Sequence, residues 1–498
     1  MNRKFCGVLV VLVAIFLGFL NLLTSMSADV PNPTEYSGDL LLDRNGKYNV
    51  PTIAMPKSTG TALRVMEYLF NKIPMCELIR HFFYKTTQFY RVRFLADQIK
   101  DAPRLGFPFK RLSPSELRRH EGREDMNLGD IKNKKQKFNS VLDFHELFKS
   151  NKSKPSIVLT QVLAHAKSIQ SEYKPFKIIF ANLEQLALES DKRFQNMKPL
   201  SIWDGVPIAV KDDFAVIGSS VSLGRDPAIA AFHVLAEQDD AVIAEFKRLG
   251  AIVIGVTVMH ELAISAFGWN KHVSGPLNAW SKKHMAGGSS AGCGVVVAAG
   301  IVPVCIGTDS GGSIRIPAAW NGIFGLAPTF GRVQSTASSI SHSTILHVGP
   351  MAATATDTAL AYLLMASVKV DGHVYASEYG PNLPPAHLGT ELASVLESKK
   401  NALQYLKTVK VGLFNDWIKD GTDPDILALF NQVVTKVFPN TIPFEIPHMY
   451  EQQLSHGIAF MSEAAFVHQQ SFFNPKVFIF LPSYVLCSIG MMSFHFVL

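Results

Sequence analysis

Two glycine-rich turns carry the residues of this sequence that are best suited to chemistry. Each turn reads Gly-Gly-Ser, and the serines are Ser289 and Ser313. Glycines before a serine let the backbone adopt conformations closed to other residues, so that consecutive N–H groups can face one hollow. In acyl transfer, such a hollow holds the oxyanion while the serine hydroxyl attacks beside it. Gly and Ser also form ordinary turns, but two such turns around one helix and one strand favour the chemical interpretation.

A small-residue segment and an apolar run separate the two turns. Residues Ala291–Ala299 are small or apolar on every side, which predicts a buried helix with Ser289 or Ser290 at its N-cap and Gly300 at its end. Ile301–Ile306 predicts a buried strand that leads into the second turn. A helix of about ten residues covers ~15 Å and the returning strand ~20 Å. The two turns are therefore expected to meet at one end of this unit.

A lysine follows an apolar strand further upstream. Val206–Val210 predicts a strand that ends at Lys211. Burial disfavours a charged ammonium and lowers its pKa, which would allow this lysine to act as a base. Asp212 and Asp213 would oppose that change if they faced the amine, so we expect them to point elsewhere or to pair with other groups.

Three motifs resemble the amidase signature family of serine hydrolases. They are GGSSAG at 287–292, GTDSGGSIRIPA at 307–318 and DGVPIAVKDDF at 204–214. The resemblance covers roughly residues 140–370. It implies an α/β protein with the amidase signature fold, in which a twisted mixed β-sheet is covered on both faces by helices.

The resemblance also implies roles for particular residues. Ser313 corresponds to the nucleophile of a Ser-Ser-Lys triad, Ser289 to the bridging serine and Lys211 to the base. Asp309 and Arg315 flank the second turn and are expected to pair and brace it. The oxyanion is expected to be held by the backbone N–H groups of Ser310, Gly311, Gly312 and Ser313.

Local patterns outside the motifs agree with an α/β arrangement. Asp240 is expected to cap an amphipathic helix at Ala241–Leu249, which Gly250 closes. Ala251–Val256 then predicts a buried strand. After the motifs, Asp357 is expected to cap another apolar helix.

The N-terminus predicts a membrane segment. Arg3 and Lys4 precede Phe5–Leu23, which has no charged residue. This run is longer than the usual ~7–15 residue core of a signal peptide and approaches the ~20 residues that span a bilayer. We interpret it as a single-pass signal-anchor, with a cleaved signal peptide ending near Ser25 or Ser27 as the alternative. Because the basic residues come first, the rest of the chain is expected to be lumenal or extracellular, within the endomembrane or secretory pathway.

These features divide the chain into three parts. We predict a signal-anchor or signal peptide at 1–27, a linker with an N-terminal helical extension at 28–139, and an amidase domain at 140–498. The chain after about residue 474 is atypical for the family, which leaves a truncated domain open. Its last part, Val477–Leu498, could be a second membrane segment, a membrane-surface element or the product of a faulty reading frame.

Composition excludes several other classes of protein. Hydrophobic residues at 47% and charged residues at 18% indicate a packed globular chain. The net charge of +7 comes without a basic run interleaved with aromatics, so no nucleic-acid partner is expected. The five cysteines are sparse and odd in number, which suggests no disulfide framework, and Cys293 and Cys305 are expected to pack as small hydrophobes. His260-Glu261 begins like a zinc motif, but Ile264 stands at the second histidine position, so no metal and no cofactor are expected.

The sequence therefore predicts a membrane-associated hydrolase that cleaves the carbon–nitrogen bond of amides through an acyl-enzyme. The membrane segment makes the chain look most like fatty acid amide hydrolase-type amidases, with a lipid amide as the small-molecule partner. A homodimer stays open. The alternatives are a subunit like that of glutamyl-tRNA amidotransferase and a catalytically inactive amidase-fold membrane protein.

Overall fold

The structure, a computed structural model, describes residues 139–228, 235–335, 344–368, 370, 404–419 and 422–446, with scattered residues between 452 and 463. All of these except Ile446 belong to one compact unit. The predicted membrane segment at 1–27 and nearly all of the extension at 28–139 lie outside the described residues.

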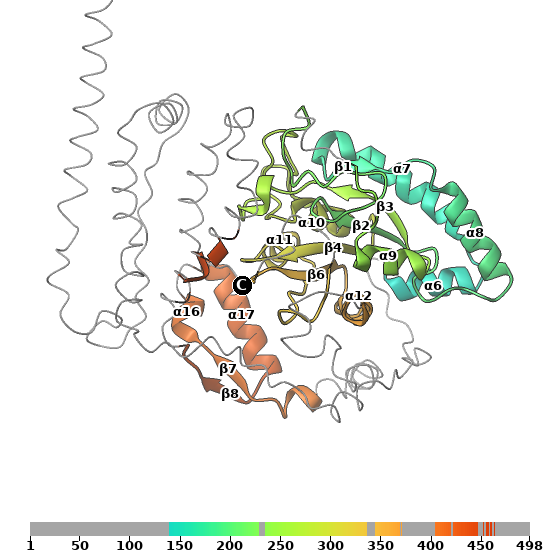
Figure 1. Cartoon of the computed structure of the whole chain (residues 1–498). Helices are drawn as coiled ribbons and strands as arrows, with labels where there is room; N and C mark the ends of the chain where they lie inside the picture. The colour runs from blue at the N-terminus through green and yellow to red at the C-terminus, as the bar shows by residue number, and fades with distance from the viewer. Residues whose placement is uncertain are drawn as a thin grey trace, which may run out of the picture. The chain divides into compact units, whose positions relative to one another are not determined.

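Figure 1 labels most of the described helices and strands. The helices are α6 (Val141–Lys149), α7 (Pro155–Tyr173), α8 (Glu184–Gln195), α9 (Ala241–Arg248), the 3-10 helix η4 (Glu261–Ala263), α10 (Ala291–Ala298), α11 (Arg315–Asn321), α12 (Ala355–Ser367), α16 (Asn415–Lys419) and α17 (Pro424–Val437). The strands are β1 (Phe176–Ile179), β2 (Pro207–Lys211), β3 (Ile252–Thr257), β4 (Val304–Asp309), β5 (Phe324–Gly325), β6 (His347–Ala352), β7 (Val411–Leu413) and β8 (Thr441–Pro443).

The main sheet places the predicted lysine strand near its centre. Its strand order is β1-β3-β2-β4-β6-β5 (Figure 1). β2 runs parallel to both β3 and β4, whereas β1 pairs antiparallel with β3 and β6 antiparallel with β4. The sheet is therefore mixed, as predicted. β2, β3 and β4 are parallel, so their carboxyl-terminal ends lie side by side. Their last residues are Lys211, Thr257 and Asp309.

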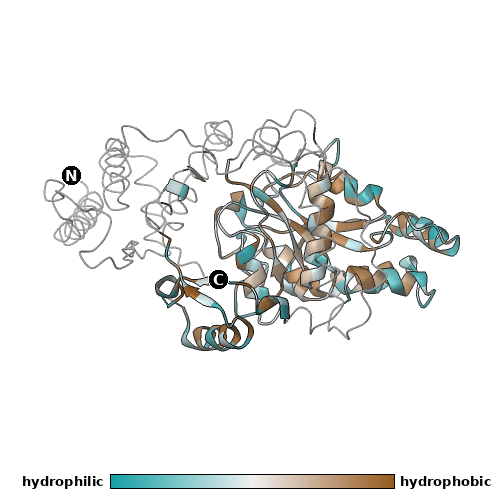
Figure 2. Cartoon of the chain, turned by 90° about the horizontal axis from the view of Figure 1, so that it is seen from below, coloured by the Kyte–Doolittle hydropathy of each residue, from teal (hydrophilic) through white to brown (hydrophobic). Residues whose placement is uncertain are grey.

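Helices cover both faces of this sheet. Along β2, Ile208 and Val210 pack in an apolar cluster with residues of α6, α9 and α12, whereas Ala209 packs in a second cluster with residues of α7, α10 and α11. This alternation follows from the two-residue period of a strand. Every residue of α10 from Ala291 to Ala298 is buried, as its small apolar sequence predicts. In Figure 2 the central strands are largely hydrophobic, while the peripheral helices carry hydrophilic residues.

The strand after α10 begins later than predicted. β4 starts at Val304, not at Ile301, because the N–H groups of Ile301 and Val302 donate to the carbonyl of Val296 and complete the end of the helix. Pro303 follows and has no N–H to offer to a sheet. The predictions for the strand before Lys211 and for the helix that Asp240 caps are confirmed.

Asp357 caps a different helix from the one predicted. The N-cap of α12 is Thr354, whose hydroxyl accepts the N–H of Asp357. Asp357 is already inside the first turn of α12, and its Oδ1 accepts the N–H of Val141 at 2.9 Å, at the start of α6. The carboxyl group therefore ties two helix N-termini together.

Cys293 of α10 and Cys305 of β4 form a disulfide, so the prediction that they pack as separate hydrophobes is wrong. Their Cα atoms are 5.3 Å apart, a usual separation for a disulfide. The pairing arises because α10 packs directly on β4, which brings two residues of different elements face to face.

The described residues after 403 form a second, small sheet in which β7 pairs in parallel with β8. The helix predicted at Pro424–Val437 is α17, and it has no buried residue. The atypical run Val477–Leu498 lies outside the described residues. Within the part of the chain that the structure describes, no helix is both long and apolar enough to cross a bilayer.

Candidate active site

Lys211 ends β2 at the edge where the parallel strands finish, and its side chain is fully buried. Its Nζ lies 2.9 Å from Ser289 Oγ. The same Nζ lies 2.6 Å from Thr308 Oγ1 and 3.1 Å from Asp213 Oδ2. The structure thus brings the predicted lysine and bridging serine into hydrogen-bond contact, while their catalytic roles stay predictions.

The electrostatics of Lys211 combine two opposing influences. Burial lowers the pKa of Lys211, and the charge of Asp213 opposes this most strongly among its neighbours. Asp212 points elsewhere, as predicted, and its carboxylate binds Lys177 Nζ at 2.5 Å. The same prediction is wrong for Asp213, because the N–H of Phe214 donates to the carbonyl of Lys211 and this tight turn folds Asp213 back towards the amine.

The turn before Ser289 requires glycine. A Cβ on Gly288 would lie 2.5 Å from the backbone Cα of Gly268, which is too close for any side chain. The peptide bond between Gly288 and Ser289 is cis. Ser289 is fully buried, and its carbonyl accepts the N–H of His260 at 3.1 Å. These backbone contacts hold the hydroxyl of Ser289 against Lys211.

The two Gly-Gly-Ser turns meet, as the lengths of the helix and strand predict. Ser290 is the N-cap residue of α10, and its N–H donates to the carbonyl of Ser313 at 3.2 Å. The hydroxyl of Ser290 donates to the carbonyl of Thr308 at 3.3 Å. Ser289 is fully buried whereas Ser313 is partly exposed, so a substrate could reach the second serine and not the first.

Asp309 organises the turn that carries Ser313. Its carboxylate accepts the N–H of Gly312 at 2.6 Å and that of Ile314 at 3.1 Å, and it binds Arg315 Nε at 2.9 Å. Burial alone would raise the pKa of Asp309, but the hydrogen bonds and charge of Arg315, with those backbone N–H groups, bring it below its usual value. The predicted pairing of Asp309 with Arg315 is confirmed, and it fixes the loop around the candidate nucleophile.

The N–H of Gly312, one of the predicted oxyanion donors, donates to the carboxylate of Asp309 in this structure. Its role as an oxyanion donor stays a prediction. Gly312 also serves the turn, since its φ of 122° favours glycine. The N–H groups of Ser310, Gly311 and Ser313 stay predicted donors.

Sequence reasoning did not single out Thr308, which contacts Lys211 through both its hydroxyl and its carbonyl oxygen. The sequence signal that could have identified Thr308 is its position in the predicted strand. Thr308 lies near the end of β4, beside β2, and parallel neighbours bring their carboxyl ends to one edge. Among the described residues, no three His, Cys, Asp or Glu side chains are grouped so that they could hold a metal ion.

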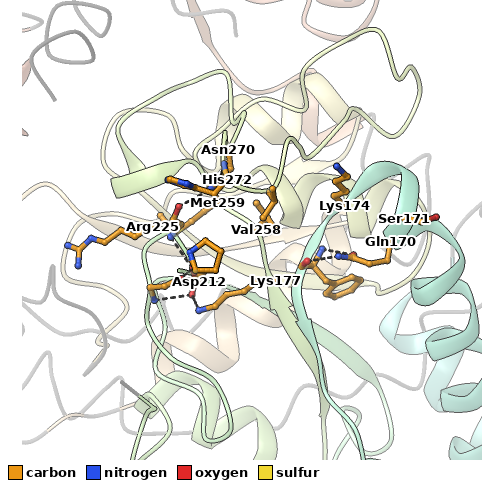
Figure 3. A pocket seen from close by; sticks show the side chains of 15 residues that line it. Gln170, Ser171, Lys174, Lys177, Asp212, Arg225, Val258, Met259, Asn270 and His272 are labelled. Carbon is orange, nitrogen blue, oxygen red and sulfur yellow. Dashed lines mark hydrogen bonds and ion pairs between the residues drawn. The ribbon is translucent and has the colours of Figure 1, made fainter. Parts of the chain in front are cut away.

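A cavity of about 430 Å³ opens beside the ends of β1, β2 and β3 (Figure 3). Its lining includes Lys177, Asp212, Arg225, Met259 and His272, but none of the three predicted catalytic residues. Figure 3 shows the bond between Lys177 and Asp212 on one side of this cavity. The cavity therefore lies next to the lysine strand, on the side that Asp212 faces.

The fold and these motifs define the class of the protein. The chain matches the model of the family described as Amidase over residues 158–479, and it belongs to that family. This confirms the resemblance to amidase signature proteins.

Within and beyond this family model, the chain is similar to several individual proteins. The chain is 27% identical over 332 residues to a fatty acid amide hydrolase of Arabidopsis thaliana, an alignment that covers 64% of this chain and 52% of the relative. It is 35% identical over 230 residues to one component of the glutamyl-tRNA(Gln) amidotransferase of Chromohalobacter salexigens, covering 46% and 44%. The chain thus spans about half the length of these relatives. The structure of native peptide amidase from Stenotrophomonas maltophilia superposes with a TM-score of 0.58 at 20% identity, covering 71% of this chain and 74% of that one, which supports the fold.

Proposed function

We propose that this chain hydrolyses amides through an acyl-enzyme. Neutral Lys211 takes a proton from Ser289, which takes one from Ser313 as its Oγ attacks the carbonyl carbon. The carbon–nitrogen bond then breaks, and the leaving amine receives the proton through Ser289. Water attacks the resulting ester, which releases the carboxylic acid and restores the hydroxyl of Ser313.

One observation carries this proposal. The amine of Lys211, fully buried, lies 2.9 Å from Ser289 Oγ, in a turn whose next residue is hydrogen-bonded to Ser313. Burial lowers the pKa of Lys211, which favours the neutral amine that a base requires.

We further propose that the substrates are fatty acid amides. The similarity to a plant fatty acid amide hydrolase and the predicted N-terminal membrane segment support this choice. Each methylene of an acyl chain that the protein buries can contribute ~0.8 kcal/mol, so turnover should rise steeply with chain length.

The test is hydrolysis of oleamide and propionamide by the purified full chain. We expect kcat/KM to be far higher for oleamide, and Ser313→Ala to remove both activities. Ser168→Ala, which changes an exposed hydroxyl on α7, is the matched control and should leave both rates unchanged. Equal rates for the two amides would contradict the fatty acid assignment and indicate a general amidase. Activity that survives in Ser313→Ala would contradict the proposed nucleophile.

A second candidate is a component of a glutamyl-tRNA amidotransferase, which the 35% identity to one such component favours. That function predicts ammonia release from glutamine or asparagine and no preference for a long acyl chain. The third candidate, an inactive amidase fold at a membrane, predicts that wild type and Ser313→Ala hydrolyse no amide at all. The same assay, with glutamine and asparagine added as substrates, therefore separates the three.

We also propose that the amidase domain lies across a membrane from the cytosol. The basic residues before Phe5–Leu23 support this orientation. Asn151-Lys152-Ser153 has the sequence of an N-glycosylation acceptor, and Asn151 is exposed in the loop after α6. A glycosidase should therefore increase the mobility of the protein on a gel, and Asn151→Gln should abolish that change. Digestion of an unglycosylated domain by protease added to intact microsomes would contradict the orientation.

A further inference from the structure

The amine of Lys211 is surrounded by more oxygen atoms than a base requires. Besides Ser289 Oγ, its Nζ contacts Thr308 Oγ1 at 2.6 Å and Asp213 Oδ2 at 3.1 Å. The hydroxyl of Thr308 donates in turn to the same Oδ2. All four side chains are buried, at 2% exposure or less. Lys211, Thr308 and Asp213 therefore form a closed triangle of hydrogen bonds behind the bridging serine.

This triangle determines where the lone pair of a neutral amine can point. Because the Thr308 hydroxyl donates its hydrogen bond to Asp213, its oxygen can only accept from Lys211. The carboxylate of Asp213 also only accepts. The carbonyl oxygen of Thr308, 3.4 Å from Nζ, likewise only accepts. The two N–H bonds of a neutral amine are thus used by the oxygen atoms of Thr308 and Asp213, and the lone pair is left facing Ser289 Oγ. This is the orientation in which Lys211 can take the proton of Ser289.

The same arrangement has an electrostatic consequence. A carboxylate 3.1 Å from the amine stabilises its charged form, which cannot accept a proton. Two other acids act on Lys211 in the same direction but less strongly, Asp309 and Asp212. Asp309 is bound to Arg315, and Asp212 is bound to Lys177. Among the described residues, Asp213 forms an ion pair with no cation other than Lys211, and its Oδ1 is buried without a hydrogen-bond partner there.

We propose that Asp213 and Thr308 are positioning residues that aim the lone pair of Lys211 at Ser289, and that the charge of Asp213 sets the pH at which this lone pair becomes available. The inference rests on the proposed function, since it assigns a role within the same proton path. It goes beyond that function because it assigns the orientation of Lys211 to Asp213 and Thr308, and the pH dependence of Lys211 to the charge of Asp213.

The test is the rate at which an alkyl fluorophosphonate labels the full chain, measured from pH 5 to 10. Asp213→Asn keeps an oxygen that can accept from Lys211 but removes the charge. We expect the midpoint of its rising pH curve to fall by at least about one pH unit, which is tenfold in rate below the midpoint. The plateau at high pH should stay within a few-fold of wild type. An unchanged midpoint would overturn the role of the charge.

Two substitutions of Thr308 test the orientation separately. Thr308→Val removes the hydroxyl that holds the amine, and we expect its plateau rate to fall at least about tenfold. Thr308→Ser restores the hydroxyl and should recover most of the rate. If the serine variant were as slow as the valine variant while its melting temperature stayed at the wild-type value, the hydroxyl would not be what positions the lysine.

A matched control is Asp212→Asn, which removes an equally buried charge one residue away that binds Lys177. Its midpoint should move much less than that of Asp213→Asn, and equal movement of both would overturn the assignment to Asp213. A second measurement reads Lys211 directly, through the ¹³Cε resonance that disappears in Lys211→Met. Its titration midpoint should fall in Asp213→Asn. Absence of labelling at Ser313 would contradict the proposed function, whereas an unchanged midpoint of this resonance would contradict the inference alone.

Discussion

Asp357 makes the stability of the fold depend on pH. Its side chain is fully buried, Oδ1 accepts the N–H of Val141, and Oδ2 has no hydrogen-bond partner among the described residues. Burial raises the pKa of Asp357 from 3.8 to about 7. The folded protein therefore keeps this proton to a higher pH than the unfolded chain, so the free energy of unfolding should fall as the pH rises from about 4 to about 7.

The size of the effect follows from the two pKa values. Each pKa unit corresponds to about 1.4 kcal/mol, so the ionised carboxyl group costs on the order of 4 kcal/mol above pH 7. Asp357→Asn cannot ionise, and its amide oxygen can still accept the N–H of Val141. We expect the variant to be more stable than wild type by about 2–4 kcal/mol at pH 8, with little or no gain at pH 4.

Urea unfolding of the two proteins at pH 4, 6 and 8 measures this directly, with the difference in free energy of unfolding as the readout. Asp425→Asn is a suitable control, because Asp425 also lies in the first turn of a helix but is exposed. Because this side chain is exposed, Asp425→Asn should change the free energy of unfolding much less than Asp357→Asn does at pH 8. A constant difference between wild type and Asp357→Asn across this range would refute the assignment of the pH dependence to the buried carboxyl group.

Two further substitutions test how the core is held together. Gly288→Ala places a Cβ 2.5 Å from the backbone of Gly268, so it should displace the serine turn and slow labelling by a fluorophosphonate about 100-fold; labelling at the wild-type rate would contradict this. Arg193→Met leaves the carboxylate of Asp204, which is fully buried, without its cation. We expect the free energy of unfolding to fall by about 2 kcal/mol, whereas Arg248→Met, at an exposed ion pair, should change it little.

Elements whose own residues decide their conformation can be predicted from the sequence. α9 begins at the cap Asp240 and has one apolar side, and β2 is a continuous apolar run, so the local pattern suffices for both. The start of β4 is misplaced by the same reasoning, because two residues with a strand pattern bond back to α10 instead. Apolar character alone cannot separate a strand from the end of a buried helix, since both are equally hydrophobic.

The candidate site likewise has residues that the sequence predicts and contacts that it does not. Ser289, Ser313 and Lys211 can be predicted as candidate catalytic residues because their local motifs are specific, and the meeting of the two turns follows from element lengths. The contacts of Asp213 and Thr308 depend on a tight turn and on the pairing of β2 with β4, and no local sequence pattern specifies either of these. The disulfide between α10 and β4 escapes prediction for a similar reason, since helix-on-strand packing has no short sequence signal.

The most direct test of the proposed proton path is to locate the residue that a fluorophosphonate labels, by mass spectrometry of the modified peptide. We predict a label on Ser313 that Ser313→Ala removes, and a rate that rises with pH and then levels off as Lys211 loses its proton. Lys211→Ala should slow labelling strongly near neutral pH, and Ser289→Ala should have an effect that is intermediate or equal. A label on another serine such as Ser290, or an unchanged rate in Lys211→Ala, would contradict the account.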